Sequence, residues 1–175
     1  MHNNISIASV FVTKAGEWKL SGLEFAHNIS DEPVANRVSI LSSLMKYEPP
    51  EKLSPGSKIQ SDLLWSLDSW GFGCLVWEIF NGALTSTNSL KNFGKIPKRL
   101  QPVYTELVNG TPRNRLTAPK FLDICRNRNG FMDNHFVNTL FFLEKIQVFS
   151  FFYFYSASKR IFKIIILDYR GSREN

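Results

Sequence analysis

The most continuous apolar pattern in the chain covers residues 65–80, Trp-Ser-Leu-Asp-Ser-Trp-Gly-Phe-Gly-Cys-Leu-Val-Trp-Glu-Ile-Phe. Apolar side chains would lie on nearly every face of a helix with this sequence, which is typical of a helix surrounded by protein. Asn81 and Gly82 follow and predict its end. Gly71 and Gly73 each cost about 1 kcal/mol relative to alanine inside a helix. We therefore expect close packing against both glycines.

Weaker patterns predict the other elements. Residues 5–12 and 17–20 are strand-like and are separated by a turn at 13–16, which predicts a short β-hairpin. Residues 25–62 are polar, contain four prolines and have no sustained period, so we expect a long surface segment with at most short helices. Helical patterns continue at residues 97–109, 117–126 and 131–148.

Composition limits the class of protein. The chain has 175 residues, of which 43% are hydrophobic and 21% are charged, as in a globular domain. Half of its net charge of +6 comes from residues 148–175, so the rest is only mildly basic. A nucleic-acid interface normally needs a denser basic face. Cys74 and Cys125 are too few for a disulfide framework or a cysteine-rich zinc site, and we expect Cys74 to be a buried free thiol.

Two stretches near the N-terminus resemble catalytic loops of a protein kinase, namely His2-Asn3-Asn4 and Gly22-Leu23-Glu24. In an active kinase these loops carry H-R-D-L-x-x-x-N and D-F-G, which supply a catalytic base and two metal ligands. The positions of those three groups are degenerate here and hold Asn4, Ser9 and Gly22. An amide is neutral and very weakly basic, so Asn4 cannot replace the aspartate. No catalytic, cofactor-binding or metal-binding residue is therefore expected.

Later residues match landmarks of a kinase C-terminal lobe in the right order. Pro49-Pro50-Glu51 resembles the A-P-E motif, and residues 68–73 resemble the start of the central buried helix, D-x-W-x-x-G. The resemblance implies that Arg115 pairs with Glu51, in a fork that can be bidentate. It also implies that the Asp68 carboxylate accepts backbone N–H groups of the catalytic loop. The structural landmarks that we expect are His2, Glu51, Asp68, Trp70, Gly73 and Arg115.

Further motifs are similar to the Scy-like pseudokinase family over about residues 2–147. They include Gly16-Glu17-Trp18-Lys19-Leu20, Val76-Trp77-Glu78-Ile79-Phe80-Asn81-Gly82, Gly94-Lys95-Ile96-Pro97-Lys98 and Gly130-Phe131-Met132. The resemblance implies a mainly α kinase-like C-terminal lobe at residues 1–130, with a short β-hairpin near its N-terminus. Residues 131–147 would begin a helical linker or HEAT-type repeat region, and residues 148–175 would be an aberrant or disordered tail.

The family resemblance also implies a function. Members of this family are non-catalytic scaffolds of Golgi-to-ER vesicle traffic, so we expect coat or trafficking proteins as partners. No cofactor, no nucleic acid and at most peripheral membrane association are expected, in the cytoplasm with a Golgi association. Met1 directly precedes the first loop, so the N-terminal lobe, with its glycine-rich loop and nucleotide-binding lysine, would be absent. The chain would therefore not be an enzyme.

Alternatives remain open on the sequence alone. An atypical kinase, with residual ATP binding or serine/threonine kinase activity, would need a compensating carboxylate such as Glu24 or Asp31. A peripheral membrane or nucleic-acid binder would use the aromatic run at 149–155 and the basic tail. The small basic cluster of Lys95, Lys98 and Arg99 is either a solvated helix start or a contact for an acidic partner. We expect an apolar stripe on the last helix at Met132, Phe136, Leu140 and Leu143.

Overall fold

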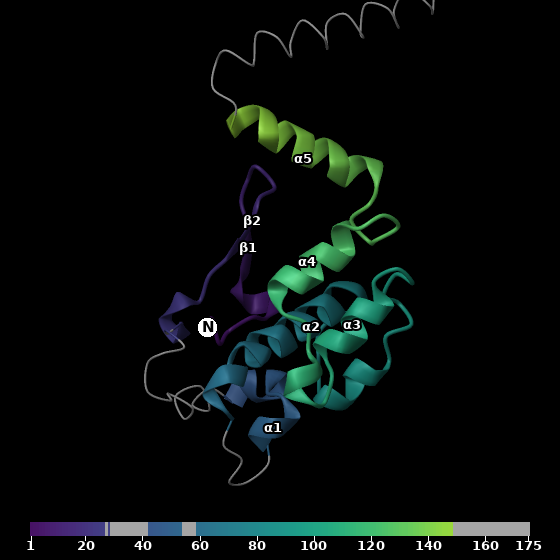
Figure 1. Cartoon of the computed structure of the whole chain (residues 1–175). Helices are drawn as coiled ribbons and strands as arrows, with labels where there is room; N and C mark the ends of the chain where they lie inside the picture. Colours follow the sequence, from purple (N-terminus) through teal and green to yellow (C-terminus); the bar gives the residue numbers. More distant parts are fainter. Residues whose placement is uncertain (27, 29–41, 54–58, 149–175) are drawn as a thin grey trace, which may run out of the picture. The chain divides into compact units, whose positions relative to one another are not determined.

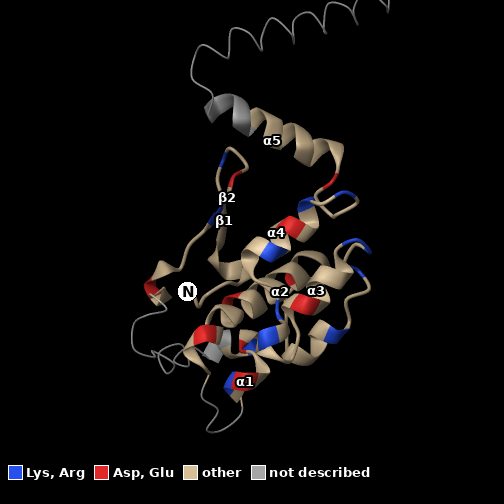
Figure 2. Ribbon diagram, viewed as in Figure 1, with Lys and Arg blue, Asp and Glu red and all other residues tan. Residues whose placement is uncertain are grey.

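The computed structural model describes residues 1–26, 28, 42–53 and 59–148 (Figure 1). Within these ranges the chain is mainly helical and has one antiparallel sheet of two strands, as predicted. It divides into two compact units, Met1–Phe131 and Met132–Asn175. Acidic and basic residues are interspersed over the elements of the first unit (Figure 2).

The predicted hairpin is present but shorter than expected. Strands β1 (Val10–Val12) and β2 (Trp18–Leu20) pair antiparallel, with Phe11 opposite Lys19. The expected first strand began at residue 5, whereas the chain forms a 3₁₀ helix, η1 (Ile7–Ser9), just before β1. Ser9 causes this difference because its hydroxyl group hydrogen-bonds to the backbone of Ser6 and closes the turn. A strand cannot extend through such a turn.

Helix α2 (Trp65–Asn81) forms the centre of the first unit, as the apolar pattern predicted. Ten of its residues are buried, including Cys74, which is a free thiol with no exposed surface. A β-carbon at Gly71 would lie 3.0 Å from the backbone oxygen of Ile5, and one at Gly73 would lie 2.5 Å from Cγ1 of Val108. The expected close packing at both glycines is confirmed.

Two further helices pack in this unit, α3 (Gln101–Leu107) and α4 (Ala118–Arg126). Helix α4 agrees with the expectation to within a residue, whereas the helix expected at 97–109 begins only at Gln101. Pro102 explains the late start. Proline has no backbone N–H and is tolerated in the first turn, where that group has no helical partner anyway. A helix that began at residue 97 would have placed Pro102 in its interior.

Short helices connect these elements. The segment that we expected to hold at most short helices has, in its described part, η4 (Ser42–Tyr47), α1 (Pro50–Leu53) and η5 (Ser61–Leu63). The others are η2 (Leu23–Phe25), η6 (Thr87–Lys91) and η7 (Pro112–Asn114). The Tyr104 hydroxyl is buried between α3 and η6 and donates a hydrogen bond of 2.7 Å to the backbone oxygen of Leu90. That bond joins η6 to the core.

The second unit contains helix α5 (His135–Val148). It begins four residues later than expected because the side-chain oxygen of Asn134 accepts the backbone N–H of Val137 and caps the helix. Of the expected apolar stripe, Phe136, Leu140 and Leu143 are exposed and Met132 is half-buried. Nearly all of the tail expected at 148–175, with its aromatic run, lies outside the described residues, and so does Asp31.

Candidate functional site

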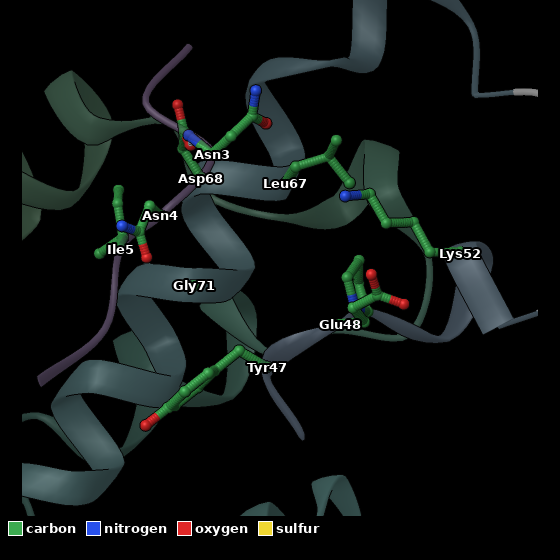
Figure 3. Close-up of a pocket in the computed structure, with 10 residues that line it drawn as sticks. Asn3, Asn4, Ile5, Tyr47, Glu48, Lys52, Leu67, Asp68 and Gly71 are labelled. Carbon is green, nitrogen blue, oxygen red and sulfur yellow. Dashed lines mark hydrogen bonds between the residues drawn. The ribbon is translucent and has the colours of Figure 1, made fainter. Parts of the chain in front are cut away.

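Asp68, in the first turn of α2, fixes the N-terminal segment of the chain. One carboxylate oxygen accepts the backbone N–H of His2 at 2.7 Å, and the other accepts the backbone N–H of Asn3 at 2.8 Å. Asn3 has a left-handed backbone conformation, with φ of 61°, and its side-chain amide donates to the backbone oxygen of Phe25. Both contacts expected of the Asp68 carboxylate are therefore present. They hold residues 2–4 against the central helix (Figure 3).

Asn4 and Gly22, two of the degenerate positions, lie against each other. Gly22 has a φ of +82°, and a β-carbon added to it would collide with the side-chain amide of Asn4. Asn4 is itself held by a hydrogen bond of 3.2 Å from its backbone N–H to Nδ1 of His2. The place where a carboxylate would project from residue 22 is thus occupied by the amide of Asn4.

Ser9, the third degenerate position, is buried, and its hydroxyl group is already engaged. The hydroxyl donates a hydrogen bond of 2.8 Å to the backbone oxygen of Ser6 and accepts the backbone N–H of the same residue. The backbone oxygen of Ser9 accepts both the N–H and the hydroxyl of Ser21, the residue before Gly22. Ser9 therefore builds the base of the hairpin. Among the described residues, no three His, Cys, Asp or Glu side chains lie close enough to hold a metal ion.

A small pocket of about 50 Å³ opens beside Asp68 (Figure 3). Asn3, Asn4 and Asp68 lie on one side of it, and Glu48 and Lys52 on another. Small-molecule sites usually have about 300–1,000 Å³, so this pocket is too small to enclose a nucleotide. Glu24, considered above as a compensating carboxylate, is exposed in η2 and is not among the residues that line it.

Arg115 forms the expected ion pair with Glu51. The guanidinium donates to both carboxylate oxygens, at 2.6 and 2.7 Å, and the Arg115 side chain has no exposed surface. Its other donors reach the backbone oxygens of Asn109 and Ser66, and its charge lies 4.8 Å from the centre of the Trp70 ring. Four hydrogen bonds and one aromatic face surround the cation. This cluster ties α1 to α2 and to the segment after η7.

The sequence of this chain is similar to those of known proteins. Over 151 residues it is 35% identical to the Probable inactive serine/threonine-protein kinase scy1 of Dictyostelium discoideum, a match that covers 84% of the chain and 18% of the relative. The chain is a relative of the Scy-like kinases. This agrees with the resemblance found in the sequence motifs. No protein-family model matches the chain.

Two other relatives match nearly the same share of this Scy-like chain. The mouse Protein-associating with the carboxyl-terminal domain of ezrin is 30% identical over 154 residues, which cover 84% of the chain and 19% of that protein. The Protein kinase domain-containing protein ppk3 of Schizosaccharomyces pombe is 24% identical over 150 residues, which cover 85% of the chain and 22% of that protein. The chain therefore spans only about a fifth of the length of the curated relatives that it matches.

The Scy-like chain contains a further buried carboxylate whose role the sequence did not reveal. Glu78 on α2 accepts the Tyr47 hydroxyl and the backbone N–H of Leu84, both at 2.9 Å, and the backbone N–H of Ile7 at 3.4 Å. Burial, and then the hydrogen bond and charge of Glu78, raise the pKa of Tyr47 above its ordinary value of 10.0. A lone glutamate in an apolar helix was the available signal, because a buried carboxylate needs donors around it.

Glu48 and Lys52 are the other residues that sequence reasoning missed at the site. Both follow η4 and line the pocket beside Asn4 and Asp68. Their place beside Asn4 and Asp68 depends on contacts between segments that are far apart in the sequence, so no local motif marks them.

In the part of the chain that the structure describes, no helix combines the length and apolar character needed to cross a membrane.

Proposed function

We propose that this chain is part of a pseudokinase, equivalent to the C-terminal lobe of a kinase, and that it does not transfer phosphate. The observation that carries the proposal is the state of the three degenerate positions. The Asn4 side chain occupies the space that a side chain at position 22 would need, and the Ser9 hydroxyl is hydrogen-bonded to the backbone of Ser6. Contacts that hold the chain together, at Asp68 and between Arg115 and Glu51, are kept.

Phosphoryl transfer needs bound metal and a carboxylate that positions the nucleophile. Asn4 can donate or accept a hydrogen bond but cannot take a proton at neutral pH, and Gly22 has no side chain to bind Mg²⁺. The relative from Dictyostelium discoideum is named as a probable inactive kinase, which supports the same conclusion. A structural role for His2, Glu51, Asp68, Trp70, Gly73 and Arg115 follows from this proposal.

We further propose that the chain acts through protein partners, as a scaffold in Golgi-to-ER vesicle traffic. One relative is named for its association with the carboxyl-terminal domain of ezrin, which supports a protein-binding role in this group. The vesicle-traffic role rests on the family resemblance. The partners would be coat or trafficking proteins, and the chain would work in the cytoplasm, at the Golgi.

A transfer assay tests the catalytic part of the proposal. The full chain is incubated with Mg²⁺, γ-labelled ATP and a general acceptor such as casein, and the label on the acceptor and on the chain is measured. We expect no more transfer than with heat-denatured chain. Time-dependent transfer by the folded chain would contradict the proposal.

The same assay examines the alternative of an atypical kinase. Glu48 favours that alternative because its carboxylate lines the pocket beside Asn4. If transfer occurs and Glu48→Gln abolishes it while Glu24→Gln does not, Glu48 replaces the missing carboxylate and the alternative is correct. Glu24 is the matched control because it is exposed and outside the pocket.

The place of action is tested with a fluorescent fusion of the full chain in cells. We expect signal that overlaps a Golgi marker and disperses with the Golgi when vesicle traffic is blocked. A signal spread evenly through the cytoplasm under both conditions would contradict the vesicle-traffic role, and would leave the non-catalytic assignment unaffected.

A further inference from the structure

A second and larger pocket lies in the first unit, where η6 and α3 approach α2. It has a volume of about 390 Å³, and its walls include the apolar side chains of Trp70, Leu90, Phe93, Tyr104 and Val108. This volume falls in the range of about 300–1,000 Å³ that is usual for binding sites. The pocket shares no lining residue with the small pocket at Asp68. We call it the η6–α3 groove.

The walls of the groove are firmly supported. Tyr104 is fully buried and hydrogen-bonded to the backbone of Leu90, and its ring packs at 5.6 Å, centre to centre, against Phe93. The Arg115 guanidinium lies over the Trp70 ring, 4.8 Å from its centre. A groove with such fixed walls is a better binding site than a flexible one, because less conformational freedom is lost on binding.

The groove has one charged side chain at its rim. Among its lining residues only Lys91 is charged, and Lys91 is exposed. Of the two carboxylates next to lining residues in the sequence, Glu51 is paired with Arg115, and Glu106 is exposed on α3. Lys91 therefore favours a ligand that carries a negative charge beside its apolar part.

The charge of the possible ligands distinguishes between them. The chain's own residues 148–175 are aromatic but carry a net charge of +3, and a second copy of the chain carries +6. Both would bring net positive charge to a groove whose charged lining residue is Lys91. Exposed polar groups at the opening, on Asn88 and Thr105, suit the backbone of an extended peptide.

We propose that the η6–α3 groove binds a short peptide segment of a protein partner, in which a large apolar side chain is flanked by acidic residues. The apolar side chain enters the groove beside Phe93 and Val108, which are half-buried. A carboxylate beside it faces Lys91. The inference deepens the proposed binding of protein partners and rests on it, but it does not depend on whether the chain transfers phosphate.

The test selects peptides from a phage-displayed library of random dodecapeptides, with the purified full chain as bait. Enriched peptides are synthesised with a fluorophore, and their affinity is measured by fluorescence anisotropy. We expect the enriched sequences to combine a large apolar residue with neighbouring Asp or Glu. Enrichment of peptides without that combination, or no enrichment at all, would overturn the proposal.

Variants then place the peptide in the groove. Lys91→Glu should weaken binding about tenfold or more, because attraction at the rim becomes repulsion. Lys98→Glu is the matched control, with the same change of charge at an exposed lysine outside the lining, and should have a much smaller effect. Equal losses in the two variants would indicate unspecific charge attraction and would overturn the site.

A variant that fills the groove tests the binding site independently of charge. Thr105→Trp introduces bulk at an exposed lining position and should abolish peptide binding. Its thermal unfolding curve must match that of the parent chain; if it does not, Asn88→Trp, at another exposed lining position, replaces it. Undiminished peptide binding by a folded, groove-filled variant would overturn the proposal. So would dimers of the parent chain, in light scattering, that dissociate when the groove is filled, because the occupant would then be a second copy.

Discussion

At the scale of single residues, Gly16 and Gly22 have the same left-handed φ of +82° but different surroundings. No atom lies within 4 Å of a β-carbon at Gly16, whereas one at Gly22 meets the Asn4 side chain. Gly16→Ala should cost only the conformational penalty of about 1–2 kcal/mol. Gly22→Ala should cost clearly more, and Asn4→Ala should remove most of the excess. Urea unfolding measures all three variants, and equal costs for the two glycines would contradict the contact.

This contact has a consequence for any attempt to restore a kinase site. A carboxylate introduced by Gly22→Asp would have to displace the Asn4 amide in addition to adopting a strained backbone. The two degenerate positions are therefore coupled, and a change at one requires a change at the other. The sequence motif identified both positions, but only the fold shows that they occupy one space.

Arg115 and Arg113 offer a matched pair of arginines. Arg115 is fully buried and makes a bidentate pair with Glu51, while Arg113 is exposed and lies 3.6 Å from Asp62. Arg115→Lys cannot keep the planar fork or all four hydrogen bonds, and each hydrogen bond lost from a charged group costs about 1.5–3 kcal/mol. Arg113→Lys should change the free energy of unfolding by less than about 0.5 kcal/mol. Chemical denaturation measures both, and similar values would refute the structural role of Arg115.

Asp68 and Asp62 provide the equivalent comparison for carboxylates. Asp68→Asn leaves one acceptor oxygen for the two backbone N–H groups of His2 and Asn3. A hydrogen bond to a charged group is worth about 1.5–3 kcal/mol, so we expect a loss of that size and faster hydrogen exchange at the Asn3 amide. Asp62→Asn, at an exposed side chain, should alter neither. Unchanged exchange in the Asp68 variant would show that the N-terminal segment is held by other contacts.

At the scale of elements, burial along α2 and α3 makes the stability of the chain sensitive to alkaline pH. Burial, and then the charge of Glu78, raise the pKa of the Cys74 thiol from 9.0 to about 12. Burial also raises the pKa of the Tyr104 hydroxyl above 10.0. These raised values mean that the folded chain holds protons that the unfolded chain releases.

Below pH 9 the Cys74 thiol is protonated in both the folded and the unfolded chain, so stability does not depend on it. As pH rises above 9 only the unfolded chain ionises, so the free energy of unfolding should fall, by up to about 1.4 kcal/mol per pH unit for each such group. Unfolding measured from pH 7 to 10.5 should show this fall, and Cys74→Ala should reduce it. A flat profile over that range would contradict the burial of these groups.

The elements also show what the sequence could predict. The bounds of α2 could be predicted from its apolar pattern, because a continuous apolar run of this length indicates a buried helix. The start of α3 was wrong because helical spacing extended to residue 97 while Pro102 allowed only a later beginning. The Arg115–Glu51 pair was predicted from spaced motifs. The hydrogen bonds around Glu78 and the place of Glu48 depend on contacts between distant segments, which no local pattern records.

At the scale of the whole molecule, the chain is a Scy-like sequence that spans about a fifth of its curated relatives. Its described part consists of a helical unit around α2 and a second unit with α5. In the first unit, Asp68 and Arg115 make the contacts that hold its segments together, and we propose that Asn4, Ser9 and Gly22 bind no metal. Function would then depend on surfaces such as the η6–α3 groove, and no longer on the pocket beside Asp68.

Thermal unfolding of the full chain with and without Mg²⁺ and ATP tests this claim most directly. A nucleotide present at 100 times its dissociation constant would stabilise the folded chain by about 2.7 kcal/mol, which shifts the melting temperature by several degrees. We predict no shift at millimolar Mg²⁺ and ATP, because Gly22 has no side chain, the Ser9 hydroxyl is engaged with Ser6, and Asn4 carries no negative charge. A rise in melting temperature that requires both ATP and Mg²⁺ and disappears with EDTA would contradict the account.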